Sequence, residues 1–408
     1  YKRQSRSMVY TMPEFLERRY NPQSRTILSL ISLISYVLTK VAVTVYAGGL
    51  VFQQVFGIDT LWGIDFFWIA AIGLVVITAL YTIFGGMKSV LYTSVLQTPI
   101  LLLGSLIILV LGFKELGGWK EMMSICSNVT VNDYGDSMTD LIRDNRDPNF
   151  PWLGALVGSS IIGFWYWCTD QFIVQRVLSG KNQKEARRGT IFGAYLKLLP
   201  VFLFLIPGMI AFALHQKSLV AGGEGFLPML ANGMHNADAA FPTLVSKLLP
   251  AGVKGIVVCG ILAALMSSLA SLFNSSAMLF TIDFYKRFRP ETSEKKLVVI
   301  GQIATAVIVL LGILWIPIMR SVGDVLYAYL QDVQSVLAPG IAAAFLLGIC
   351  WKRASAKGGM WGLLAGMVIG LTRLGAKVYY STVGAGAGDS LFKYLFYDLN
   401  WLFFCGWM

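Results

Sequence analysis

The residues best suited to chemistry lie together in one apolar stretch, residues 164–176, whose sequence is FWYWCTDQFIVQR. The stretch combines aromatic rings with a carboxylate, two amides and a guanidinium. Polar groups at membrane depth are costly unless they pair or line a cavity, so this mixture predicts a ligand or transport path. The alternative is an aromatic belt at the membrane interface, which needs the rings but not the polar groups.

A second polar cluster, residues 260–276, has the sequence GILAALMSSLASLFNSS. Hydroxyl and backbone carbonyl oxygens are the donors that a hard cation prefers. Such neutral oxygens predict a site that holds a monovalent cation weakly enough to release it. Small residues at this spacing are also used for close helix packing, with serine hydroxyls bonding across to a neighbouring helix.

Three further polar side chains interrupt apolar runs: Lys40, Lys197 and Gln331. A lysine within a span is usually paired or faces a ligand, although one near a span end can extend its ammonium to the headgroups. We expect Lys197 to be functional. Gln331 offers both donor and acceptor atoms, which suits a neutral hydroxylated ligand; its alternative role is an interhelical hydrogen bond.

These residues must be positioned by helices that span a membrane. Of the 408 residues, 56% are hydrophobic and only 13% are charged, whereas about 25% are charged in soluble domains. Runs long enough to cross a bilayer, about 20 residues each, recur along the chain. They are residues 26–56, 61–84, 89–113, 152–178, 190–214, 253–284, 297–319, 322–350 and 358–378, and a further run opens at Tyr397. Such lengths favour an all-α integral membrane protein over a barrel, whose strands alternate over about ten residues.

Basic residues account for the formal charge of +11. They gather before the first run and in every second connection: Lys2, Arg3, Arg6, Arg18, Arg19 and Arg25; Lys181, Lys184, Arg187 and Arg188; Lys286, Arg287, Arg289, Lys295 and Lys296; and Lys352, Arg353 and Lys357. The positive-inside bias places these segments in the cytoplasm, and the acidic connection 114–151 outside. Because topology accounts for the basic residues, we expect a lipid bilayer and no nucleic acid as partner.

Glycine and proline interrupt three of the runs. Gly154, Gly158 and Gly163 precede the aromatic stretch; Pro200, Pro207 and Gly208 interrupt the fifth run; Pro339 and Gly340 are expected to break the eighth. Discontinuous helices free backbone groups and are where secondary transporters bind their substrates. The alternative for each proline is a simple packing kink.

Other chemistry finds little support in the sequence. His215 and His235 lack metal-ligand spacing to Cys, Asp or Glu, and Cys126 has no partner predicted for a disulfide. No nucleophile and base stand together. We therefore expect no enzyme and no transition-metal site, and no obligatory protein partner is indicated.

Several of these motifs, taken together, resemble the sodium/solute symporter family, and within it the sodium/glucose cotransporter branch. The resemblance lies in residues 164–176, in the segment AYLKL around Lys197, in MSSLASLFNS at residues 266–275, in YLQ followed by LAPGIAAAFLLG and WKR at residues 329–353, and in TMPEFLERRY at residues 11–20. The motifs follow the order of the family and cover nearly the whole chain.

The resemblance implies a leucine-transporter-type fold of inverted five-helix repeats. The first three runs would be core helices three to five and the next five would be core helices six to ten, so that the first two core helices are absent from this chain. We expect residues 1–25 to be a cytoplasmic loop segment and residues 26–408 to be a transmembrane transport domain, truncated at both ends. The protein would be a multi-pass protein of the plasma membrane.

The resemblance also implies roles for individual residues. Sodium would be held by the Ala264 carbonyl and the hydroxyls of Ser267 and Ser268. Sugar would contact Lys197 and Gln331 and stack on Tyr166, the inner-gate aromatic, with Trp167 beside it; Tyr327 would lie at the outer gate. Gly163 departs from the pattern, because sugar-transporting relatives often have a hydroxyl or amide there.

Ser94 is a second departure, because relatives commonly carry an aspartate that contributes to a second cation site. Without that charge a second buried sodium would be costly, and we predict one sodium per sugar. The function implied is symport of sodium ion with a glucose- or galactose-like sugar, or a polyol, by alternating access. A ligand-responsive membrane sensor or a sodium-leak pathway on the same scaffold is the alternative.

Overall fold

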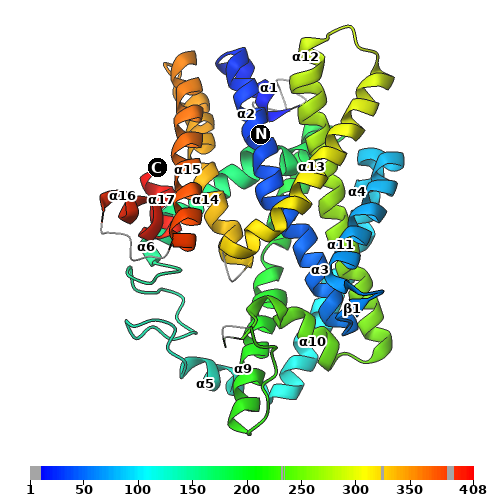
Figure 1. Cartoon of the computed structure of the whole chain (residues 1–408), viewed down its shortest axis with the longest axis vertical. Helices are drawn as coiled ribbons and strands as arrows, with labels where there is room; N and C mark the ends of the chain where they lie inside the picture. Colours follow the sequence, from blue (N-terminus) through cyan, green and yellow to red (C-terminus); the bar gives the residue numbers. More distant parts are fainter. Residues whose placement is uncertain (1–10, 231–232, 234, 323–325, 384–389) are drawn as a thin grey trace. The chain divides into compact units, whose positions relative to one another are not determined.

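The computed structural model describes residues 11–230, 233, 235–322, 326–383 and 390–408, and these residues are mostly helical (Figure 1). The described residues do not include residues 1–10 of the expected cytoplasmic segment, and so leave out Lys2, Arg3 and Arg6. The chain forms two compact units. Unit 1 comprises Tyr1–Val43, Asn145–Arg187 and Ser271–Met408, and unit 2 comprises Thr44–Asp144 and Arg188–Ala270.

Unit 1 contains α1 (Met12–Arg19), α2 (Pro22–Ser35), η1 (Tyr36–Val41), α6 (Trp152–Phe164), η2 (Trp165–Thr169), α7 (Gln171–Leu178), η5 (Leu279–Tyr285), α12 (Lys286–Phe288), α13 (Glu294–Val322), α14 (Leu326–Cys350), α15 (Ala356–Val383), α16 (Leu391–Lys393), η6 (Tyr394–Asp398) and α17 (Trp401–Trp407). Unit 2 contains β1 (Thr60–Leu61), β2 (Ile64–Asp65), α4 (Phe66–Leu116), α5 (Trp119–Ser127), η3 (Val201–Leu205), α9 (Ile206–Val220), η4 (Ala237–Ala239) and α10 (Ala240–Leu248). The unit boundaries fall within α3 (Ala42–Phe56), α8 (Gln183–Leu196) and α11 (Ala251–Met278).

Among the described residues, seven helices are long and apolar enough to cross a membrane: Pro22–Phe56, Gln97–Leu116, Gln183–Val220, Ala251–Phe288, Glu294–Pro317, Tyr329–Cys350 and Ala356–Tyr380. The predicted all-α membrane fold is confirmed. One expected connection is not seen, because α4 runs through both the second and third predicted spans and its backbone stays helical at Gly85 and Gly86.

The predicted break at Pro339 and Gly340 is wrong. Both residues lie inside α14, which continues from Leu326 to Cys350. A Cβ on Gly340 would lie 3.0 Å from the Cα of Gly366, so glycine allows α14 and α15 to cross closely. Figure 1 shows these two helices side by side. Gly340 therefore serves close helix packing rather than a break in α14.

A two-stranded hairpin in unit 2 precedes α4. Strands β1 and β2 are antiparallel, with Thr60 opposite Asp65 and Leu61 opposite Ile64. Trp62 and Gly63 connect them with φ values of 55° and 76°. Two consecutive positive φ values define the tight hairpin turn whose twist matches that of the strands. Asp65 then accepts a hydrogen bond from the Phe67 N–H and begins α4.

An apolar core joins α4, α5, α9 and α10 within unit 2. Its fully buried members include Ile108 of α4, Met122 of α5, Ile210 of α9 and Leu244 of α10. Gly112 lets α4 approach α9, because a Cβ there would lie 3.0 Å from an Ile210 methyl. This core holds the α4 segment that follows Ser94.

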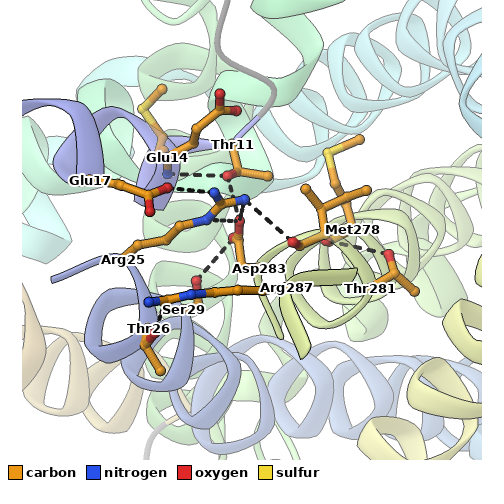
Figure 2. Close-up of polar contacts among 12 residues, drawn as sticks. Thr11, Glu14, Glu17, Arg25, Thr26, Ser29, Met278, Thr281, Asp283 and Arg287 are labelled. Atoms are coloured by element: carbon orange, nitrogen blue, oxygen red, sulfur yellow. Dashed lines mark hydrogen bonds and ion pairs between the residues drawn. The ribbon is translucent and has the colours of Figure 1, made fainter. Parts of the chain in front are cut away.

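A buried carboxylate, Asp283 of η5, fastens α1 and α2 within unit 1 (Figure 2). One carboxylate oxygen accepts hydrogen bonds from the Thr11 hydroxyl at 3.0 Å and from the Arg25 Nε at 2.7 Å. The other accepts from the Ser29 hydroxyl at 2.9 Å. Arg25 also pairs with Glu17 at 2.6 Å. Asp283 therefore connects α1, its N-cap residue and the start of α2 through one network of ion pairs and hydrogen bonds.

Arg19, at the end of α1, forms hydrogen bonds with the end of α14. The guanidinium of Arg19 donates to the carbonyl oxygens of Gly348, Trp351 and Ala354, which lie at or beyond the last turn of α14. Carbonyls at a helix C-terminus lack partners within the helix, and a basic side chain satisfies them. Tyr20 donates its hydroxyl to the Ala344 carbonyl at 2.8 Å. Burial raises the pKa of the Tyr20 phenol above its usual value.

Candidate functional site

The aromatic stretch lies where the fourth predicted span breaks. Helix α6 ends at Phe164, η2 forms one turn of π-helix, and Asp170 adopts an extended conformation before α7 begins. The Asp170 carboxylate caps α7 by accepting from the Phe172 N–H at 3.1 Å. Single π-helical turns interrupt the regular helical hydrogen-bonding pattern and are frequent at functional sites. The span was expected to be interrupted at Gly154, Gly158 and Gly163, but these residues lie within α6 and the break comes after Phe164.

Gly154 and Gly158, which were expected to interrupt the run, instead allow close helix packing. A Cβ at Gly154 or Gly158 would lie 3.0 Å or 2.5 Å from atoms of Leu402, so both glycines allow α17 to pack on α6. At Gly163, by contrast, a Cβ would meet no atom of a described neighbour within 4 Å. Gly163, the residue that departs from the family pattern, therefore has open space beside it.

Tyr166 and Trp167 project from η2. Their rings meet edge to face at a centroid distance of 5.1 Å. Tyr166 is half-buried, whereas Trp167 is 41% exposed. A partly exposed aromatic pair of this kind presents ring faces against which a sugar could stack.

Gln331 and Tyr327 lie one turn apart near the start of α14. The Gln331 amide donates to the Tyr327 hydroxyl at 2.9 Å, and the Tyr327 side chain is 54% exposed. Helix α14 packs against η2 within unit 1. The structure thus brings together the elements that carry four of the predicted residues: Tyr166, Trp167, Tyr327 and Gln331.

Lys197, the remaining predicted sugar contact, belongs to unit 2. It lies just after α8, where the backbone forms a turn before η3, and its N–H donates to the carbonyls of Gly193 and Ala194. The side chain is exposed. The predicted interruption of the fifth span is present, with the π-helical turn η3 following Pro200 and α9 beginning next to Pro207.

The candidate sodium residues lie on the unit 2 part of α11. Ser267 is buried, and Ala264 and Ser268 are half-buried on the same helix. The Ser267 hydroxyl lies 2.6 Å from that of Ser94 on α4. The two hydroxyls share a hydrogen bond between helices, which is the packing role given above as the alternative for this cluster. Hydroxyl and carbonyl oxygens are also donors that suit a hard monovalent cation.

The ion pairs of two buried carboxylates, Asp170 and Asp332, escaped the sequence reasoning. Asp170 pairs with Lys40 of η1. Asp332, next to Gln331, pairs with the buried Arg373 at 3.3 Å and with Lys377 at 2.7 Å, both on α15. The available signal was that a carboxylate in one apolar run and a cation in another are expected to meet, since neither is stable alone in lipid.

The chain matches known transporters over most of its length. A profile of the Sodium:solute symporter family matches residues 1–366. A sodium/myo-inositol cotransporter 2 of Homo sapiens is 40% identical over 378 residues, covering 90% of this chain and 55% of that protein. A sodium/glucose cotransporter 4 of Mus musculus is 37% identical over 409 residues, covering 96% of this chain and 59% of the relative. A sodium/mannose cotransporter of Bos taurus is 38% identical over 397 residues, covering 94% and 65%.

The fold is likewise that of a solved transporter. The structure of a Na+-coupled sialic acid symporter in a substrate-bound outward-open state matches with a TM-score of 0.68 and 21% identity, over 93% of this chain and 78% of that one. These matches define the fold as that of a multi-span membrane protein of the leucine-transporter type. The chain belongs to the sodium:solute symporter family, as its motifs predicted. It spans somewhat more than half the length of the curated relatives it matches.

Proposed function

We propose that the protein is a sodium-coupled symporter for a sugar or polyol. The observation that carries the proposal is the 40% identity to a sodium/myo-inositol cotransporter across 90% of this chain. The coupling ion would be sodium, held by the Ala264 carbonyl and the hydroxyls of Ser267 and Ser268. The protein would lie in the plasma membrane with the segment before α2 in the cytoplasm, in keeping with its basic residues.

Coupling would arise from differential affinity. Sodium can shift the protein toward an outward-open state only to the extent that it binds this state more tightly than the inward-open one. Sugar bound to the sodium-loaded protein would then favour closure. By linkage, each ligand raises the affinity for the other by the same factor. Discontinuous helices such as α6–η2–α7 free backbone groups that can form a substrate or ion site.

The sugar would be bound by a ring face and polar side chains. Tyr166 would stack on the pyranose or polyol ring with Trp167 beside it, Gln331 and Lys197 would hydrogen-bond its hydroxyls, and Tyr327 would close the outer side. The contact of Gln331 with Tyr327 supports this role, because it joins a proposed ligand residue to a proposed gate residue at 2.9 Å.

Gln331→Glu and Lys197→Ala should both weaken sugar transport. Glutamate loses the amide donor and adds a charge, and alanine removes an ammonium whose hydrogen bonds are worth about 1.5 to 3 kcal/mol. We expect the sugar half-saturation to rise by about tenfold or more for each variant. Sugar-concentration series at saturating sodium measure this. Unchanged half-saturation for every transported sugar in both variants would place the sugar site elsewhere.

Ser94 should limit coupling to one sodium per sugar. Its hydroxyl and that of Ser267 are both neutral, and a second buried sodium without a compensating anion carries a large desolvation cost. Reversal potentials at matched gradients should fit one sodium. Ser94→Asp should create a second coupled ion. A reversal potential that fits two sodium ions in the unmodified protein would contradict the prediction.

The proposal is tested by an uptake screen of the full-length protein with labelled glucose, galactose, myo-inositol, mannose and an unrelated amino acid as control. Sodium-dependent uptake of one or more sugars or polyols is expected. Binding without net uptake would favour the membrane sensor. Sodium flux that ignores every sugar would favour the leak pathway.

A further inference from the structure

Lys40 and Asp170 form a buried ion pair at two irregular helical segments of unit 1. The Lys40 side chain is 9% exposed and that of Asp170 is 2% exposed. Lys40 lies in the π-helical turn η1, and Asp170 directly follows the π-helical turn η2. The pair therefore links the points at which two apolar helices depart from regular geometry.

The Asp170 carboxylate accepts hydrogen bonds from three donors, two on η1 and one on α7. One oxygen accepts from the Tyr36 hydroxyl at 2.9 Å and from the Phe172 N–H at 3.1 Å, and the other accepts from the Lys40 ammonium. The Tyr36 oxygen also accepts from the Phe172 N–H, at 3.0 Å. These hydrogen bonds fix the Asp170 carboxylate at the point where η2 ends and α7 begins.

The Lys40 ammonium is enclosed by aromatic rings. Its nitrogen lies 4.3 Å from the ring centre of Phe172, 4.8 Å from Tyr36, 5.3 Å from Tyr166 and 5.9 Å from Trp165. A cation over a ring face is attracted by its quadrupole, and most strongly where water is excluded. Tyr166, the proposed inner gate, is thus one wall of a cage around a fixed charge.

We propose that Lys40 and Asp170 are positioning residues, which set the orientation of Tyr166 and thereby the affinity for sugar. The inference rests on the proposed function. Asp170 holds the ammonium in place, and the ammonium orients the Tyr166 ring. A residue that is held in its binding geometry beforehand costs less to order when ligand binds. The pair is not proposed to touch the sugar.

A double-mutant cycle tests this route. Lys40→Met keeps the stem of the side chain and removes the charge, and we expect the sugar half-saturation to rise by about tenfold with little change in the sodium half-saturation. In a Tyr166→Leu background the same change should add almost nothing, because residues that act through one another are not additive. Tyr36→Phe, which keeps the ring and loses one hydrogen bond to Asp170, should give a smaller rise.

Two controls separate positioning from general damage. Glu17→Gln breaks the pair with Arg25 at 2.6 Å in the same unit, and it should leave the sugar half-saturation unchanged. Lys40→Arg keeps the charge and should retain most of the sugar affinity of the unmodified protein. If Lys40→Met proves too unstable to assay, Tyr36→Phe and Lys40→Arg carry the test, and Tyr36→Phe with wild-type affinity overturns the inference.

Additive effects of Lys40→Met and Tyr166→Leu on sugar half-saturation would also overturn the inference. A lower maximal rate of Lys40→Met with wild-type half-saturation would overturn it as well, because a lower rate alone reports only a smaller amount of folded protein. Failure of the unmodified protein to take up any sugar would instead remove the proposed function, and this inference with it.

Discussion

Ser267→Ala should raise the sodium concentration needed for half-maximal transport by about tenfold or more, since a methyl group cannot coordinate a hard cation. Ser268→Ala should act in the same direction. Ser267 is buried on α11 and its hydroxyl lies 2.6 Å from that of Ser94, so the substitution also leaves the Ser94 oxygen facing a methyl group. Sodium-activation curves at saturating sugar measure the effect.

Ser275→Ala is the matched control for this prediction. Ser275 is fully buried on the same helix, and its hydroxyl donates to the carbonyl of Ser271 one turn earlier at 2.8 Å. Its loss should leave sodium activation unchanged. Wild-type sodium dependence in both Ser267→Ala and Ser268→Ala would remove the sodium site from this helix.

Asp283→Asn should destabilise the protein by about 3 to 5 kcal/mol, the typical cost of removing one partner of a buried ion pair. The asparagine has the same shape, but it cannot accept equally from Thr11, Arg25 and Ser29, and it leaves the Arg25 charge with Glu17 alone (Figure 2). Thermal unfolding of the purified protein in detergent measures the change, with loss of the folded form recorded as temperature rises.

Glu14→Gln provides the comparison for Asp283→Asn. Glu14 pairs with Arg18 one turn later at 2.7 Å, and the Arg18 side chain is 49% exposed. Exposed pairs of this kind contribute about 0 to 1 kcal/mol, so the control should unfold close to the unmodified protein. Equal stability of the two variants would show that Asp283 does not fasten α1 and α2.

The sequence predicted the features that depend on local composition. Apolar runs identified most of the spans, and the mixture of rings and polar groups singled out residues 164–176, although the helix break there was expected at the preceding glycines. These predictions succeed because hydrocarbon thickness and the cost of polar groups in lipid act on each segment separately. The family motifs supplied the register that periodicity alone does not give.

Features that depend on distant partners could not be predicted in the same way. Lys40 and Asp170 are 130 residues apart. Nothing in either apolar run indicates which of several charged residues elsewhere in the chain its own charge will pair with. Pro339 looked like a helix break because the cost of a missing N–H is local, whereas the close contact of Gly340 with Gly366 on α15 is visible only in the fold. The division of α11 between two units is likewise invisible in its continuous helical sequence.

The most direct test of sodium-coupled symport is accumulation of sugar against its own gradient by the full-length protein in proteoliposomes. An inward sodium gradient should concentrate the labelled sugar or polyol inside, and collapse of that gradient with a sodium ionophore should release it. Uptake that merely equilibrates, to the same level with and without the sodium gradient, would contradict the account.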